Sequence, residues 1–170
     1  ADFPVLGDAK QALSRLNKIL TKKPVRYSNT SSKLLRNKFV DADIEHTGSR
    51  IHPANLVKAL SDMLPEKAIV LGDAGAHMLW LNCYLNLAKD QRYQNPGSFG
   101  PMASGVNGSI GVKCANPDKL VVSGCGDGGY LMAGFELLTA VQYDIPVIWI
   151  IFNNGEFNVI KKFLLNMFGK

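Results

Sequence analysis

Three leucines recur at helical spacing near the start of the chain and form one apolar stripe. They follow Asp8, a residue type that favours the position just before a helix, and they predict a helix over residues 9–20. The stripe consists of Leu13, Leu16 and Leu20. Residues 21–50 are polar and basic and predict a linker, with at most a short helix over residues 33–39.

From residue 51 onward, helical patterns alternate with short apolar runs. Helices are expected over residues 53–64, 76–87, 103–115 and 131–143, and strands over residues 68–71, 120–123 and 147–152. The run 147–152 is apolar throughout, which favours a central position in a sheet. Alternating strands and helices predict an α/β fold, with a parallel sheet covered by helices on both faces.

Three polar turns each follow one of the expected strands. They are Gly72 to Gly75, Gly126 to Gly129 and Asn153 to Glu156, and the second reads as a tight turn. Ligands of open α/β sheets bind outside the carboxyl ends of the strands. We therefore expect these three turns to converge at one edge of the sheet.

Composition and charge exclude several classes of protein. The chain has 170 residues, 46% of them apolar and 19% charged, which suits one compact domain with an appendage. No apolar run reaches the roughly 18 residues of a membrane span, and the first residues lack a signal-peptide pattern. We expect a cytoplasmic protein with no membrane partner. Residues 10–38 carry nine Lys or Arg and no acid, which we interpret as a solvated helix face and connector, without a nucleic-acid partner.

The three cysteines lie far apart in the sequence. Cys83, Cys114 and Cys125 form no pair with the spacing of a zinc site. We interpret them as reduced, mostly buried thiols. Cys125 lies in an apolar strand with no histidine near it in sequence, which argues against a nucleophile.

The turn Gly126-Asp127-Gly128-Gly129 combines glycines with a carboxylate. Glycines after a buried strand, followed by a helix, bring backbone N–H groups close to an anion. Asp127 would repel a phosphate unless a divalent cation lay between them. Magnesium takes oxygen ligands and commonly joins a carboxylate to phosphate oxygens. Asn154 follows the next strand, 27 residues later, and its amide oxygen is the expected second ligand.

This arrangement resembles the cofactor-binding motif of thiamine diphosphate (ThDP) enzymes. A Gly-Asp-Gly turn, a helix, a strand and an Asn-Asn pair occur here in that order. The resemblance implies ThDP and Mg²⁺ as cofactors, with Asp127, Asn154 and the carbonyl of Glu156 as metal ligands. It also places Gly126, Gly128 and Gly129 against the diphosphate, the last two through their N–H groups.

Two further segments resemble the acetolactate synthase and pyruvate oxidase branch of that family. Residues 72–80 are similar to its second phosphate loop, which implies diphosphate contacts from Ala76 and His77. Residues 97–103 are similar to the loop that holds the aminopyrimidine. The residues implied there are Gly100, through its carbonyl, and Met102, with Met132 and Val159 near the thiazolium. A partly buried helix histidine and an ordinary core methionine are the alternatives for His77 and Met102.

The resemblance also divides the chain. Residues 1–20 are expected to be the last helix of a preceding central domain, residues 21–50 a basic linker, and residues 51–170 a diphosphate-binding domain truncated at its C-terminus. The glutamate that activates the cofactor lies, in this family, in a separate pyrimidine domain, so we expect no catalytic residue in this chain and no activity from it alone.

The function implied is that of a 2-oxo acid carboligase or decarboxylase resembling acetolactate synthase. Its substrate would be a 2-oxo acid such as pyruvate, and the parent enzyme would be a homodimer or homotetramer. The resemblance leaves open whether the parent enzyme also binds FAD. A pyruvate oxidase-like or decarboxylase enzyme is the close alternative, and Gly97-Ser98-Phe99 leans toward the oxidase. A non-catalytic phosphate-binding module lacks a supporting GxGxxG or GxxxxGK[ST] motif. A basic interaction protein acting through residues 10–38 is the third class.

Overall fold

The computed structural model describes residues 6–20 and 50–169, in two units that are considered separately, Ala1–Phe39 and Val40–Lys170. The expected linker and its short helix over residues 33–39 lie outside the described residues. No helix of the described part is long and apolar enough to cross a membrane.

In the first unit, helix α1 spans Ala9–Ile19, as the leucine spacing predicted. The Asp8 carboxylate accepts a hydrogen bond from Gln11 N at 3.0 Å, which confirms the expected cap. No residue of α1 is buried, and the basic residues of the helix are exposed, so the described part of the basic stretch is a solvated helix face.

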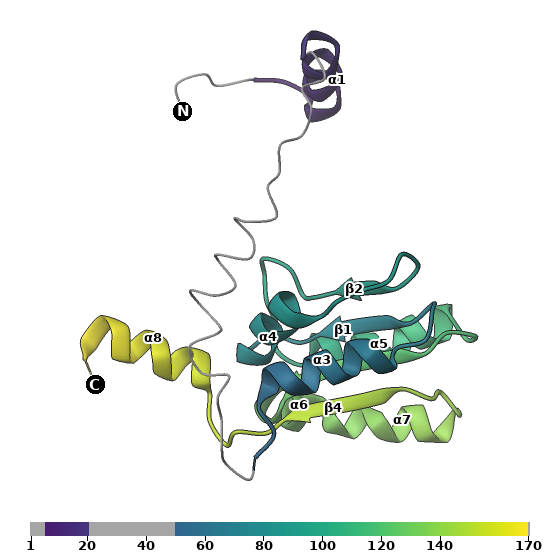
Figure 1. Cartoon of the computed structure of the whole chain (residues 1–170), viewed down its shortest axis with the longest axis vertical. Coiled ribbons are helices and arrows are strands. Elements are labelled where there is room, and N and C mark those ends of the chain that lie inside the picture. Colours follow the sequence, from purple (N-terminus) through teal and green to yellow (C-terminus); the bar gives the residue numbers. More distant parts are fainter. Residues whose placement is uncertain (1–5, 21–49, 170) are drawn as a thin grey trace. The chain divides into compact units, whose positions relative to one another are not determined.

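The second unit is an α/β domain built on one parallel sheet. Its strands are β1 (Ile69–Gly72), β2 (Arg92–Gln94), β3 (Val121–Gly126) and β4 (Ile148–Phe152), in the order β2-β1-β3-β4. Its helices are α3 (Pro53–Met63), α4 (Ala76–Tyr84), α5 (Ser104–Ala115), α6 (Asp127–Ala133), the short 3₁₀ helix η2 (Gly134–Glu136), α7 (Leu137–Gln142) and α8 (Asn158–Phe168). Figure 1 shows the strands running side by side with helices around them.

Both faces of the sheet are covered by helices, as expected. On one face, Val70 and Val122 pack with Val57 of α3 and Leu81 of α4. Two clusters cover the other face: the first joins Ile69, Leu71 and Val121 to Val112 of α5, and the second joins Val106 of α5 and Ala133 of α6 to Cys125. The alternation of side chains along each parallel strand places successive residues in opposite layers.

The structure corrects the expected position of the last strand. Strand β4 lies at an edge of the described sheet, next to β3, and its residues are exposed or half-buried. The central strands are β1 and β3, which are buried almost throughout. An apolar run predicts that a strand is covered, but it does not show whether strands on both sides or another surface cover it.

Several element boundaries also differ from expectation. Strand β2 was not expected, α4 ends three residues before residue 87, and the helix expected over 131–143 is divided into α6, η2 and α7 at Gly134. Glycine is a poor helix former, which accounts for the break. The Gly126–Gly129 segment is no separate turn, because α6 begins directly at Asp127 after the extended Gly126.

His52, to which the sequence assigned no role, caps α3. Its Nδ1 accepts a hydrogen bond from Ala54 N at 3.2 Å, and its ring lies edge-on against Trp80 with centroids 5.2 Å apart. Pro53 occupies the first turn of the helix, as expected. The imidazole therefore takes the place that Ser, Asp or Asn usually occupies.

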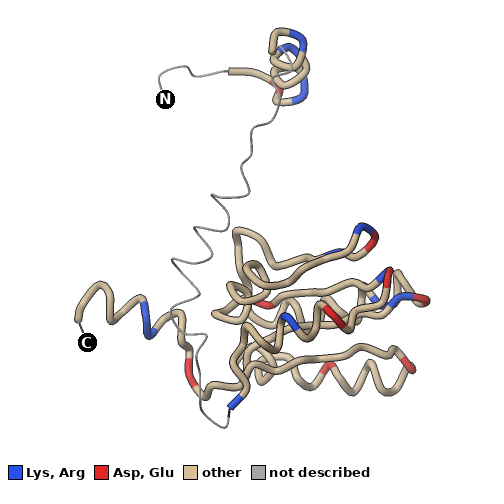
Figure 2. The backbone as a smooth tube through the Cα atoms, viewed as in Figure 1, with Lys and Arg blue, Asp and Glu red and all other residues tan. Residues whose placement is uncertain are grey.

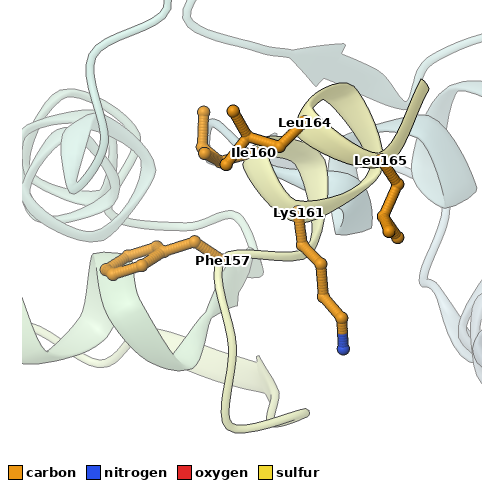
Figure 3. Close-up of a pocket in the computed structure, with 5 residues that line it drawn as sticks. All are labelled: Phe157, Ile160, Lys161, Leu164 and Leu165. Atoms are coloured by element: carbon orange, nitrogen blue, oxygen red, sulfur yellow. The ribbon is translucent and has the colours of Figure 1, made fainter. Parts of the chain in front are cut away.

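Large apolar side chains remain exposed after β3. They lie on α6 to α7 (Leu131, Met132, Phe135, Leu138 and Val141), on β4 (Ile148 and Ile151) and along α8, none of whose residues is buried. An open apolar pocket of about 340 Å³ lies on α8 and is lined by Phe157, Ile160, Lys161, Leu164 and Leu165. Figure 3 shows these five side chains. Phe99, in the loop before α5, is 92% exposed. Exposed apolar surface of this extent marks contact sites on a protein.

Charged residues of the second unit occur at the amino ends of the strands. Seven of them lie in the loops that precede β1, β2, β3 and β4, at Glu66, Lys67, Lys89, Asp90, Asp118, Lys119 and Asp144. Figure 2 shows blue and red segments at these ends of the strands. The segments that directly follow β1, β3 and β4 carry Asp73, Asp127 (the first residue of α6) and Glu156.

The close approach of α5 to β1 predicts opposite effects for one substitution at two sites of the same helix. A Cβ at Gly105 would lie 2.9 Å from Asp73 N, whereas a Cβ at Gly111 would meet no atom within 4 Å. Gly105→Ala should lower the free energy of unfolding by about 1–3 kcal/mol through overpacking. Gly111→Ala should raise it by about 0.5–1 kcal/mol through helix propensity. Urea unfolding measures both, and equal shifts of the same sign would contradict the packing described.

Candidate functional site

The loops that follow β1, β3 and β4 lie at one edge of the sheet. The pairing register places Gly72 of β1 beside Gly124 of β3, and Gly126 of β3 beside Phe152 of β4. Because the strands are parallel, the segments that continue from these residues leave the sheet on the same side (Figure 1). The expected convergence of the three polar turns is confirmed.

Asp127 connects the ends of β3 and β4. It is the first residue of α6, and its Oδ2 accepts a hydrogen bond from Gly155 N at 2.9 Å. The bond fixes the turn that carries Asn154 against the start of α6. Asn154 is exposed, and its Oδ1 lies 3.5 Å from Glu156 N, at the outer limit of a hydrogen bond. The structure therefore brings together the two residues whose side chains the sequence singled out as metal ligands.

Two further interactions hold Glu156. Its carbonyl accepts a hydrogen bond from Asn158 N at 3.0 Å, and its carboxylate forms an ion pair with Lys161. A carbonyl oxygen has two lone pairs, so one remains for a further partner. The carboxylate is exposed and its pairing is local.

His77 lies buried between the ends of β1 and β3. It is in the first turn of α4 and is 6% exposed, and its ring stacks on Phe152 with centroids 5.9 Å apart. A Cβ at Gly126 would lie 3.1 Å from its Nδ1. Burial lowers the pKa of His77 below its usual value, against opposing contributions from Asp73 and Asp127, so the ring is neutral near pH 7.

The Nε2 atom of His77 is one of two buried side-chain polar atoms that lack a hydrogen-bond partner among the described residues. Buried polar atoms are rarely left unpaired, and each such case calls for an explanation. Because this nitrogen lies near the carboxyl ends of β3 and β4, it is suited to bind a polar ligand.

Met102 and Phe157 both lie against Gly128. A Cβ at Gly128 would be 3.1 Å from the Met102 Cε and 2.7 Å from Phe157 Cε1. Met102 comes from the loop before α5, and Phe157 caps α8. Only glycine leaves room for this approach, in which both side chains lie against the first turn of α6.

Gly129 makes a similar close approach to a residue that the sequence analysis gave no role. A Cβ there would overlap Asp73 Oδ2. Asp73 is fully buried, and its carboxylate accepts hydrogen bonds from Ala103 N at 2.9 Å and Gly105 N at 3.1 Å. Ser104 Oγ lies 3.2 Å from the carboxylate and shares its single proton with Pro101 O, at 2.8 Å. The available signal was its position, a carboxylate directly after a wholly apolar strand.

The remaining expected cofactor residues lie around this cluster. Ala76 begins α4, half-buried, and Gly126 ends β3. Gly100 is exposed and has a φ of +59°, in the left-handed region. Met132 and Val159 lie on α6 and α8 with side chains 66% and 44% exposed, so the structure does not bury them at the strand ends.

The cysteines are all free thiols, but only Cys125 is buried, which corrects the expectation of mostly buried residues. Burial, with a smaller contribution from the Asp73 charge, raises the pKa of Cys125 to about 12. Its thiol is therefore protonated near neutral pH, which supports the view that it is no nucleophile.

The donor set of the strand-end cluster fits a hard cation that also binds phosphate. In the described residues no three His, Cys, Asp or Glu side chains group as a metal site. What the cluster offers is one carboxylate (Asp127), one amide oxygen (Asn154) and a backbone carbonyl (Glu156). Magnesium commonly takes one or two protein carboxylates and completes its shell with phosphate oxygens and water. The glycine-lined start of α6 beside these oxygens is suited to the phosphates.

Comparison with known proteins agrees with this description. The family model for the thiamine pyrophosphate enzyme C-terminal TPP binding domain matches residues 73–170. The chain is 29% identical over 165 residues to an acetolactate synthase large subunit of Buchnera aphidicola (subsp. Schizaphis graminum), covering 95% of this chain and 29% of the relative. It is 34% identical over 115 residues to a sulfoacetaldehyde acetyltransferase of Alcaligenes xylosoxydans xylosoxydans, covering 68% of this chain and 19% of the relative.

A solved structure shows the same fold. The thiamine diphosphate-dependent 4-hydroxybenzoylformate decarboxylase of Rhodococcus jostii RHA1 superposes with a TM-score of 0.65 at 28% identity, covering 72% of this chain and 23% of that one. The chain thus spans less than a third of the length of these relatives. With a family model that matches more than half of its residues, this chain belongs to the C-terminal TPP-binding domain family of thiamine pyrophosphate enzymes.

Proposed function

We propose that this chain binds ThDP through a magnesium ion held by Asp127, Asn154 and the carbonyl of Glu156. The observation that carries the proposal is the hydrogen bond from Gly155 N to Asp127 Oδ2, which holds the Asn154 turn beside the carboxylate. A carboxylate at the start of a helix would repel a diphosphate unless a cation lay between the two. The oxygen donors of this cluster are those that magnesium prefers.

The diphosphate would lie against the starts of α4 and α6. Gly128 and Gly129 lie in the first turn of α6, where backbone N–H groups have no carbonyl partner within the helix. Their lack of a side chain leaves room for Met102, Phe157 and Asp73 beside them. Ala76 and His77 come from the start of α4, together with Gly126. His77 can donate an N–H to a phosphate oxygen when the ring carries a proton on Nε2, the nitrogen that lacks a partner among the described residues.

The organic part of the cofactor would lie over the loop before α5. Met102 stands against Gly128, which places an apolar side chain next to the diphosphate cradle. The Gly100 carbonyl belongs to the same loop and is exposed. When bound, ThDP supplies a carbon nucleophile that acts on 2-oxo acids. The part of the protein is to orient the cofactor and to supply charge around it.

The whole enzyme is proposed to be an acetolactate synthase-like carboligase that acts on a 2-oxo acid such as pyruvate. Several acetolactate synthase large subunits align with 95% of the chain, which favours this over the oxidase-like alternative. The exposed apolar residues of α6, α7, β4 and α8 support further protein contacts, such as those of a dimer or tetramer. Phe99, on the loop before α5, supports the same expectation.

Removing the charge of Asp127 should abolish magnesium-dependent binding of ThDP. Asp127→Asn keeps an oxygen that accepts from Gly155 N, so the turn is retained while the metal loses its carboxylate. Asn154→Ala should weaken binding strongly, because one oxygen ligand is lost. Calorimetric titration with ThDP, with magnesium or with a chelator, measures both effects. Asp118→Asn, in the loop before β3, is the matched control, and unchanged affinity in Asp127→Asn would refute the metal site.

The 170-residue chain by itself should not turn over pyruvate. The resemblance places the activating glutamate in a different domain, and general acid–base catalysis of this kind is worth about 10²- to 10⁴-fold in rate. Loss of a closed, dry site would reduce the rate further. Release of carbon dioxide from pyruvate with ThDP and magnesium is the measurement. Steady release clearly above that of free ThDP would show that the chain carries its own base.

A further inference from the structure

Asp73 forms the most heavily hydrogen-bonded buried group at the strand ends. Its carboxylate is fully buried directly after β1 and faces three donors from one short segment, Ala103 to Gly105, at the start of α5. Its own N–H donates to Gly124 O of β3 at 2.9 Å. A buried charge is tolerated only when hydrogen bonds satisfy it. Here they come from Ala103, at the end of the loop that carries Met102, and from Ser104 and Gly105 in the first turn of α5.

The segment held by Asp73 includes a residue in an unfavourable backbone conformation. Ala103 has a φ of +71°, in the left-handed region that residues with a Cβ rarely adopt. Its N–H is the donor to Asp73 Oδ2 at 2.9 Å. Persistence of such a conformation requires that its surroundings fix it. The bond to Asp73 and the burial of the Ala103 side chain are what fix it here.

Met102 precedes Ala103 directly, and its direction depends on that conformation. With Ala103 held, the Met102 Cε reaches the surface of Gly128. Gly129, the next residue of α6, lies against the same Asp73 carboxylate. One side chain thus sets the spacing between the loop that carries Met102 and the turn that carries Asp127.

We propose that Asp73 is a positioning residue, which holds Met102 and the 97–103 loop in register with the diphosphate cradle on α6. This inference rests on the proposed function, since it assigns Asp73 to the organic half of the ThDP site. Asp73 itself touches neither cofactor nor metal. Its removal should therefore affect recognition of the ring system while the binding of a bare diphosphate with magnesium is retained.

The variant that separates these roles is Asp73→Asn. The asparagine amide has one oxygen and one NH₂ group in place of two oxygens. Its NH₂ group must therefore face a donor, either Ala103 N or the pair Ser104 Oγ and Gly105 N, and that hydrogen bond is lost. The matched control is Asp62→Asn, the same change at an exposed position of α3. Unfolding curves establish which variants are folded before binding is compared.

The direct readout is nuclear magnetic resonance of the full chain. In the unmodified protein the Met102 methyl should show a nuclear Overhauser contact to the Gly128 α-protons, and the coupling constant of Ala103 should report a positive φ. Both signatures should be lost in Asp73→Asn and kept in Asp62→Asn. Their survival in folded Asp73→Asn would overturn the proposal.

Binding provides the second readout, with ThDP and inorganic pyrophosphate as probes, each with magnesium. Asp73→Asn should weaken ThDP binding about tenfold or more and leave pyrophosphate binding within about twofold. Asp127→Asn should weaken both. Equal losses for the two probes in Asp73→Asn would contradict a role confined to the ring system. If the unmodified chain binds neither probe, the proposed function fails, and the Met102 and Ala103 signals still decide whether Asp73 positions the loop.

If Asp73→Asn does not fold, hydrogen exchange of the unmodified chain tests the same claim. The amides of Ala103 and Gly105 should exchange as slowly as those of β3, because both donate to a fully buried carboxylate. Exchange as fast as that of the exposed residues 97–100 would overturn the proposal.

Discussion

The buried carboxylate of Asp73 is the interaction on which the arrangement of the strand ends depends. It follows the central strand β1, accepts hydrogen bonds from the start of α5, and leaves no room for a side chain at Gly129. The free energy of burying such a group is recovered only if every donor is in place. This requirement fixes α5, the loop before it and the first turn of α6 relative to one another.

The proposed chemistry follows from what this frame leaves exposed. Asp127 and Asn154 are joined through Gly155, and the first turn of α6 lies beside them, with Met102 and Phe157 against Gly128. His77 contributes a buried nitrogen that lacks a partner among the described residues. Anions bind well where helix N-termini and a cation converge, and the cluster provides two helix starts at the end of a parallel sheet.

The sequence predicted the features that depend on local pattern. Alternating apolar runs and helical spacing indicated the parallel sheet, and the 27-residue interval between Asp127 and Asn154 placed both at neighbouring strand ends. The sequence could not predict the hydrogen bond from Ala103 N to Asp73, because these residues lie 30 positions apart. The bond also requires a left-handed backbone at Ala103, a conformation that alanine rarely adopts. The edge position of β4 was missed for a related reason. The composition of an apolar strand does not show whether a neighbouring strand or a different part of a protein covers it.

The most direct test of the account is to follow the backbone amide signals of the unmodified chain while ThDP is added with magnesium. We predict shifts confined to the loops after β1, β3 and β4 and to residues 97–103, which disappear when magnesium is chelated. Persistence of the shifts without magnesium would contradict the role of Asp127 and Asn154. Shifts centred on the basic residues of α1, or no shifts at all, would contradict the assignment of the cofactor to the strand ends.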